Sequence, residues 1–153
     1  MNEIKRILVV SRMTTHCRLA LHYGISLAKR YDATLSVIHV VHNPFGLDGW
    51  KLPPIEYDYS TLMEKSKEDI GAAIRAERAQ GMAIKEVIRE GDPIRTVIDV
   101  IKKDNIDLLI MLAHEQGHLE HFLFGRANEE LVRRMPCSIC LVKKEPAVFS
   151  EVE

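Results

Sequence analysis

The chain is poor in cysteine, carries almost no net charge and contains no long apolar run. Three cysteines, Cys17, Cys137 and Cys140, make neither the even set of a secreted disulfide framework nor a four-cysteine zinc set. A formal net charge of -1, from 21 basic and 22 acidic residues, produces no field that would attract nucleic acid or an anionic membrane. No apolar run approaches the length of a membrane span. We therefore expect no nucleic-acid partner and no membrane partner.

The amino-terminal segment also lacks the features of a secretory signal. The first apolar run begins at Ile7, after six residues that include Lys5 and Arg6, which leaves no room for the apolar core and cleavage site of a signal peptide. Together with the few cysteines, this favours a cytoplasmic location. The 153 residues suffice for one domain that buries roughly 70% of its unfolded surface. We expect that domain to cover residues 1–144, with 145–153 as a flexible tail.

Short apolar runs alternate along the chain with stretches of helical periodicity. Apolar runs that do not alternate with polar residues indicate strands buried on both faces. Gly81 predicts the end of a long helix, and Gly91-Asp92-Pro93 predicts the start of the next. Residues 42–59 contain several prolines and glycines and predict an irregular excursion. The expected strands cover 7–10, 34–41, 83–89, 108–111 and 138–142, and the expected helices begin near 17, 60, 93 and 126 and end near 30, 80, 103 and 134.

This alternation of strands and helices predicts the fold class. It requires right-handed crossovers and a parallel sheet covered on both faces. We expect a doubly wound α/β domain, Rossmann-like or flavodoxin-like, with five strands in the order 3-2-1-4-5. Such sheets bind ligands beyond the carboxyl ends of their strands, where the strand order reverses. The loops after Val10 and Met111 should therefore meet at the functional site.

Several segments, taken in order, resemble the universal stress protein family over nearly the whole chain. They are the apolar run 7–10, the strand 35–41 with His39-Val40-Val41, Gly91-Asp92-Pro93, the segment 107–111, Gly125, and the segment 135–142 that contains Pro136-Cys137-Ser138. The resemblance implies a stress-response protein that is regulatory and not an enzyme. It also implies a homodimer through the last strand, Ser138 to Val142, and a protein partner of unknown identity.

Members of that family that bind ATP resemble one another in a phosphate loop of glycine, two residues, glycine, nine residues, then glycine and serine or threonine. Here this frame falls on Leu112, Glu115, Gly125 and Arg126, so only Gly125 matches. Glu115 would repel a polyphosphate at close range. The family's aspartate after the first strand, near the nucleotide and its metal, is Arg12 here. We therefore expect no ordinary binding of ATP with magnesium and no required cofactor.

The candidate crevice keeps only part of the family's phosphate loop, and its arginines support a second hypothesis. Arg12 and Arg126 could converge beside Gly125 and hold a carboxylate, a lone phosphate or a nucleotide such as ATP or AMP. In the alternative, one arginine simply fills the pocket. The residues assigned to this crevice are Ser11, Arg12, Val40, Leu112, His114, Glu115, Gly125 and Arg126.

A third hypothesis comes from the segment His114-Glu115-Gln116-Gly117-His118, which satisfies the H-E-x-x-H pattern of zinc hydrolases. The pattern works when a helix brings both histidines to one face beside a glutamate, and His121 extends the cluster. Here the segment begins three residues after a predicted strand, and Gly117 costs a helix about 1 kcal/mol relative to alanine. We therefore expect a solvated, titratable loop rather than a catalytic metal centre.

Cys137 and Cys140 form a C-x-x-C pair that enters a predicted strand. Positions three apart on a strand point to opposite faces, whereas redox pairs of this kind open a helix. We expect two core thiols, and we interpret Cys17 in the same way. His39, inside a predicted strand, is interpreted as a packing or surface residue.

Overall fold

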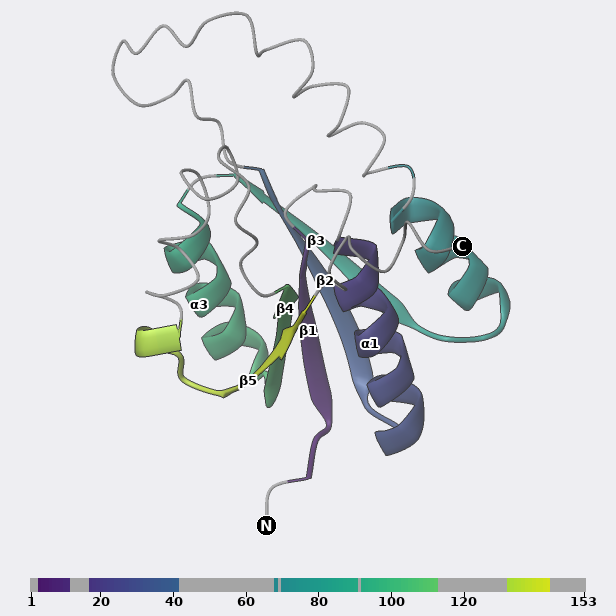
Figure 1. The fold of residues 1–153 in the computed structure, drawn as a ribbon, viewed down its shortest axis with the longest axis horizontal. Coiled ribbons are helices and arrows are strands. Elements are labelled where there is room, and N and C mark those ends of the chain that lie inside the picture. The colour runs from purple at the N-terminus through teal and green to yellow at the C-terminus, as the bar shows by residue number, and fades with distance from the viewer. Residues whose placement is uncertain are drawn as a thin grey trace, which may run out of the picture.

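The computed structural model describes residues 3–11, 17–41, 68, 70–90, 92–112 and 132–143. Within these ranges, no helix combines the length and apolarity needed to cross a bilayer. A further helix covers residues 70–79, and 132–134 are helical. The labelled elements (Figure 1) are β1 (Arg6–Ser11), α1 (Cys17–Tyr31), β2 (Thr34–Val41), β3 (Ile84–Glu90), α3 (Pro93–Asp104), β4 (Leu108–Leu112) and β5 (Ser138–Val142).

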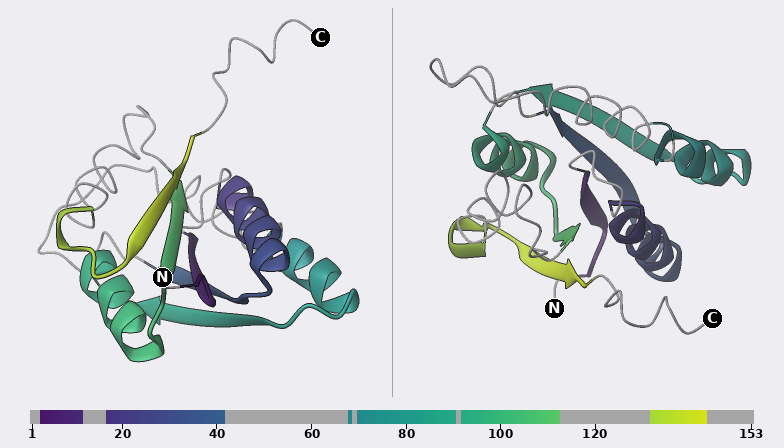
Figure 2. Two further views of the ribbon diagram at one scale, coloured as in Figure 1. Left: turned by 90° about the horizontal axis from the view of Figure 1, so that it is seen from below. Right: turned by 45° about the horizontal axis from the view of Figure 1, so that its top comes forward.

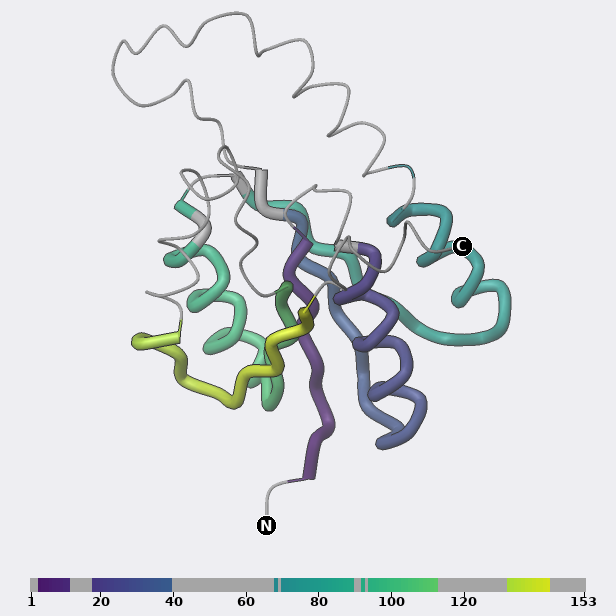
Figure 3. Tube along the Cα trace, in the orientation of Figure 1, coloured from purple at the N-terminus to yellow at the C-terminus, as the bar shows by residue number. Residues whose placement is uncertain are grey.

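The five strands form one parallel sheet in the order β3-β2-β1-β4-β5, which confirms the expected fold class and strand order. β1 is central, and the Cα trace in Figure 3 shows it between β2 and β4. The Asp107 carboxylate fixes the start of this arrangement, because it accepts hydrogen bonds from the backbone N–H groups of Lys5 and Arg6 at 3.0 and 2.9 Å. These hydrogen bonds link the amino-terminal ends of β1 and β4.

Helices cover both faces of the sheet (Figure 2), and each face has its own apolar core. The α1-side cluster joins alternate strand residues such as Ile7 and Val9 to α1 and the helix 70–79. The α3-side cluster joins the intervening residues, such as Leu8 and Val10, to α3. Each aliphatic side chain buried in this way contributes about 1.5–3 kcal/mol, so the unalternating apolar runs of the sequence are explained by burial on two faces.

Local signals set the ends of the helices as expected. One carboxylate oxygen of Asp92 accepts from the backbone N–H groups of Ile94 and Arg95 at 2.9 and 3.0 Å, and Pro93 occupies the first turn. Asn105 ends α3 in the left-handed conformation, with φ 50°. Gly81, with φ 93°, follows the helix 70–79 and confirms the predicted stop.

The observed bounds differ from the expected ones by one residue at several ends, as at β1, which begins at Arg6 and ends at Ser11. β3 is shifted by one residue, from 83–89 to Ile84–Glu90. The excursion 42–59, the starts of the second and last helices, and the tail 145–153 lie outside the described residues, so these expectations stay predictions.

Cys137 and Cys140 are free and half-buried. Cys137 packs against the α3-side cluster and Cys140 against the α1-side cluster. Their placement on opposite faces of the sheet confirms the expectation from strand geometry. The two thiols therefore do not form a redox pair. The side chain of Cys17 is outside the described set.

Candidate functional site

The strand order reverses between β1 and β4, and their carboxyl ends define the candidate crevice. Ser11 ends β1 and Leu112 ends β4. Each lies two residues beyond the last paired positions of these strands, Val9 and Ile110. The structure therefore brings together the two strand ends that the sequence assigned to the site, with Val40 near the end of the neighbouring β2.

Leu112 is the residue that the sequence resemblance aligns with the first glycine of the family's phosphate loop. Its side chain is half-buried and packs against the α1-side cluster. A glycine at this position would leave the backbone open to close approach by a ligand, whereas leucine adds an isobutyl group beside that backbone.

Ser11 and His39 bring polar atoms to the floor of this region. Ser11 is 2% exposed and His39 is 4% exposed, and the two residues are partners in the β1–β2 register. Val9 and Val37, two positions earlier on each strand, belong to the α1-side cluster, so Ser11 and His39 face the same side. Ser11 was predicted as a site residue, whereas His39 was predicted only as a packing or surface residue.

His39 is the inner end of a polar chain that crosses three elements. Its Nε2 lies 3.1 Å from Oε2 of Glu86 on β3, and Oε1 of Glu86 accepts from Nη1 of Arg78 at 3.0 Å. Arg78 comes from the helix 70–79 and also donates from Nε to the carbonyl of Ile84 at 3.2 Å. The chain ties this helix to β3 and β2. Sequence reasoning missed it, since His39 and Glu86 lie 47 residues apart and only the strand register brings them together.

The remaining predicted site residues lie outside the described part of the chain. They are Arg12, His114, Glu115, His118, His121, Gly125 and Arg126. The anion hypothesis and the zinc hypothesis therefore stay predictions. Among the residues that the structure does describe, no group of three or more histidines, cysteines or acidic residues is arranged to hold a metal ion.

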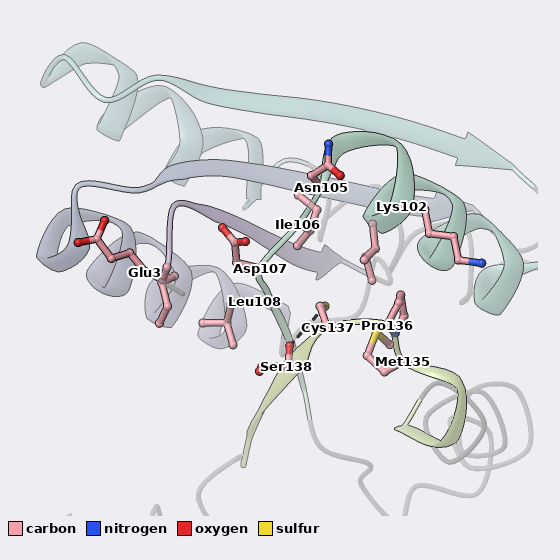
Figure 4. Close-up of a pocket in the computed structure, with 12 residues that line it drawn as sticks. Glu3, Lys102, Asn105, Ile106, Asp107, Leu108, Met135, Pro136, Cys137 and Ser138 are labelled. Atoms are coloured by element: carbon pink, nitrogen blue, oxygen red, sulfur yellow. Dashed lines mark hydrogen bonds between the residues drawn. The ribbon is translucent and has the colours of Figure 1, made fainter. Parts of the chain in front are cut away.

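A cavity of about 830 Å³ lies at the opposite, amino-terminal ends of the strands, where β4 and β5 begin. Figure 4 shows it between the end of α3 and the segment that precedes β5. Its lining includes Ile101, Asp107 and Cys137. Burial raises the pKa of the Cys137 thiol above its ordinary value of 9.0, and the Asp107 carboxylate raises it further, against a hydrogen bond from the Leu109 backbone that lowers it. The thiol is therefore protonated and weakly nucleophilic at neutral pH.

Comparison with known proteins agrees with the fold described. A universal stress protein of Methanocaldococcus jannaschii is 27% identical over 149 residues, which cover 94% of this chain and 84% of that protein. The structure of the universal stress protein UspA from Lactobacillus plantarum is similar with a TM-score of 0.64 at 21% identity, covering 93% of this chain and 99% of that one. A universal stress protein family protein from Arabidopsis thaliana with AMP bound gives a TM-score of 0.61 at 14% identity, covering 94% of each chain.

The model of the universal stress protein family matches residues 3–143, a range that includes all five strands of the sheet. The sequence resemblance, the strand order and this match agree, and the chain belongs to the universal stress protein family.

Proposed function

We propose that this chain is a non-catalytic regulatory member of its family, whose crevice does not hold ATP with magnesium in the usual way. The observation that carries the proposal is Leu112. Its half-buried side chain ends β4 at the position where ATP-binding members have the first glycine of their phosphate loop. Backbone N–H groups can cradle phosphates only where the chain can be approached closely, and an isobutyl group hinders that approach.

Charge in the adjoining sequence supports the same proposal. Arg12 follows β1 directly, at the place of the family's aspartate, so a cation stands where a metal-bound nucleotide would need an anion. Glu115 stands at the second glycine position and adds a carboxylate where phosphates would approach. Each change by itself weakens a magnesium–polyphosphate site, and together they remove most of its chemistry.

Calorimetric titration of the metal-free protein with ATP and Mg²⁺ tests this proposal. We expect no heat of binding at micromolar concentrations. The reverting variant Arg12→Asp/Leu112→Gly/Glu115→Gly/Arg126→Ser restores the glycine, acidic and hydroxyl positions and should gain binding. Arg133→Ser, which changes an exposed arginine elsewhere, is the matched control and should gain none. One-to-one binding of ATP with Mg²⁺ by the natural sequence would contradict the proposal.

A second candidate function is the binding of a small anion or a nucleoside monophosphate by Arg12, Gly125 and Arg126. Two observations favour it: a neighbour of the same fold was solved with AMP bound, and Ser11 leads directly from the crevice floor into Arg12. Titration with AMP and with inorganic phosphate, both without Mg²⁺, tests it. Binding that is lost in Arg12→Ala and Arg126→Ala but kept in Arg133→Ala supports this function, and the absence of heat with both probes rejects it.

Self-association through β5 is part of the regulatory proposal. β5 lies at the edge of the sheet, and its Leu141 side chain is 49% exposed. An apolar edge strand offers unpaired backbone groups to another strand and is usually covered in native proteins. A second copy of the chain, paired through the same strand about a two-fold axis, would cover both edges at once.

A further inference from the structure

Two buried polar side chains lie next to each other where the carboxyl ends of β1 and β2 meet. Ser11 and His39 are the buried polar residues of the described ranges, at 2% and 4% exposure. They are direct partners in the parallel register and face the α1 side of the sheet. Neighbouring parallel strands are separated by about 5 Å, so the two side chains border one small volume.

Each of these side chains has an atom without a partner. Within the described part of the chain, neither Oγ of Ser11 nor Nδ1 of His39 has a hydrogen-bond partner, although both atoms are buried. The other ring nitrogen of His39 is engaged by Glu86 at 3.1 Å. Buried polar atoms in native proteins nearly always bond to protein or to ordered water, because the loss of hydration of an unpaired buried atom is not compensated by a new hydrogen bond.

The chemistry of the two atoms specifies the partner that they need. Because Nε2 faces a carboxylate, it is the nitrogen that donates in the Nε2–H tautomer, in which Nδ1 is an acceptor. The partner must then donate to Nδ1 and also bond to a hydroxyl, which both donates and accepts. A water molecule has this capacity and is the usual occupant of small polar sites inside proteins.

We propose that Ser11 Oγ and His39 Nδ1 together bind one ordered internal water molecule. The water completes a continuous relay from Ser11 through His39 and Glu86 to Arg78, and so connects the end of β1 with β2, β3 and the helix 70–79. It holds the end of β1, which Arg12 follows directly in the sequence. The relay does not depend on the proposed function, since it needs no ligand in the crevice.

A crystal structure of the ligand-free protein and NMR of the histidine ring test the proposal directly on the natural sequence. We expect one oxygen within about 2.7–3.2 Å of both Ser11 Oγ and His39 Nδ1. We also expect ¹⁵N shifts that place the proton on Nε2 and show an unprotonated Nδ1. A dry site, or a proton on Nδ1 with Nε2 bare, would overturn the proposal.

A double-mutant cycle tests the same bridge by energy. Ser11→Ala should raise the unfolding equilibrium constant about two- to tenfold. The effect should persist in His39→Asn, whose amide can replace Nδ1, and should largely disappear in His39→Gln, whose amide replaces only Nε2. Ser36→Ala, a half-buried serine on the opposite face of β2, is the control and should be additive with both histidine variants. An equal effect of Ser11→Ala in the two backgrounds would refute the bridge, and if a variant does not fold, the crystal and NMR measurements still decide.

Discussion

A single carboxylate oxygen of Asp92 serves two backbone N–H groups at the start of α3. Asp92→Ala leaves both donors without this partner and should lower the free energy of unfolding by about 1 kcal/mol. For a chain of this size that corresponds to a fall in Tm of about 2–4 °C, measurable by thermal denaturation. Asp99→Ala, an exposed aspartate of the same helix, should change Tm little, and an equal loss in both variants would show that capping is not the cause.

Cys137 offers a second prediction at the scale of one residue. Since burial raises the pKa of its thiol, alkylation by iodoacetamide in the folded protein should be slow at neutral pH, should rise with pH, and should reach half of its maximal rate only above pH 9.0. Peptide mass spectrometry gives the rate at this residue. The same protein in denaturant is the reference, where the midpoint of the pH–rate profile should be lower. If the folded and the denatured protein had the same midpoint but alkylation were slower in the folded protein, steric shielding alone would explain the slower rate.

Residues differ in how far the sequence predicts their roles. The cap at Asp92 was predictable because its partners lie two and three positions along the chain. The bond between His39 and Glu86 was not, because it depends on the pairing of β2 with β3. The hydrogen bonds from Lys5 and Arg6 to Asp107 span about a hundred residues and were also not predictable from the sequence.

At the scale of the elements, α1 approaches β1 closely at Gly24. A β-carbon there would overlap Cγ2 of Val9 and lie 3.3 Å from Cδ1 of Leu35. Gly24→Ala gains about 1 kcal/mol of helix propensity but overpacks the core by about 1–3 kcal/mol, so we expect a net loss of stability in denaturant titration. Ser26→Ala, exposed on the same helix, should be neutral or slightly stabilising.

A second variant separates the two effects of Gly24→Ala on stability, which are overpacking against β1 and the change in helix propensity. In a Val9→Ala background the overlapping methyl group is absent, so Gly24→Ala should cost less there than in the natural sequence. An unchanged cost would contradict the packing explanation.

Strands and helices were predictable wherever burial leaves a pattern in the sequence. β1 and β4 are buried on both faces, and their apolar runs located them within a residue or two. The contact at Gly24 could not be predicted, because a glycine in a helical pattern indicates only a weaker helix until the strand beneath it is known.

At the scale of the whole molecule, the exposed edge at β5 predicts association. Light scattering during size-exclusion chromatography should give twice the 17.5 kDa mass of the chain. Leu141→Lys should shift the protein to the monomer, because it places a charge on the edge strand. Tyr31→Lys, at another exposed apolar side chain, at the end of α1, should leave the dimer intact. A monomeric natural protein would rule out the proposed pairing.

The sheet order followed from the sequence because crossover handedness and burial on both faces leave few topologies. The residues of the candidate site could be predicted from the sequence only in part. Ser11 and Leu112 lie at the predicted strand ends, whereas Arg12 and residues 113–131 lie outside the described part of the chain, so their place in the site stays a prediction. A side chain that follows a strand end has no periodic signal in the sequence from which its position could be derived.

The central place of β1 has a consequence for synthesis on the ribosome. β1 emerges first and can pair with β2 early, but its other neighbour, β4, begins only at Leu108. At translation rates of about 5–20 residues per second, one edge of this strand, whose residues 7–10 are all apolar, stays uncovered for roughly 5–20 seconds. During that interval the nascent chain can form only a half-sheet, and the open edge of β1 is exposed to association with other chains.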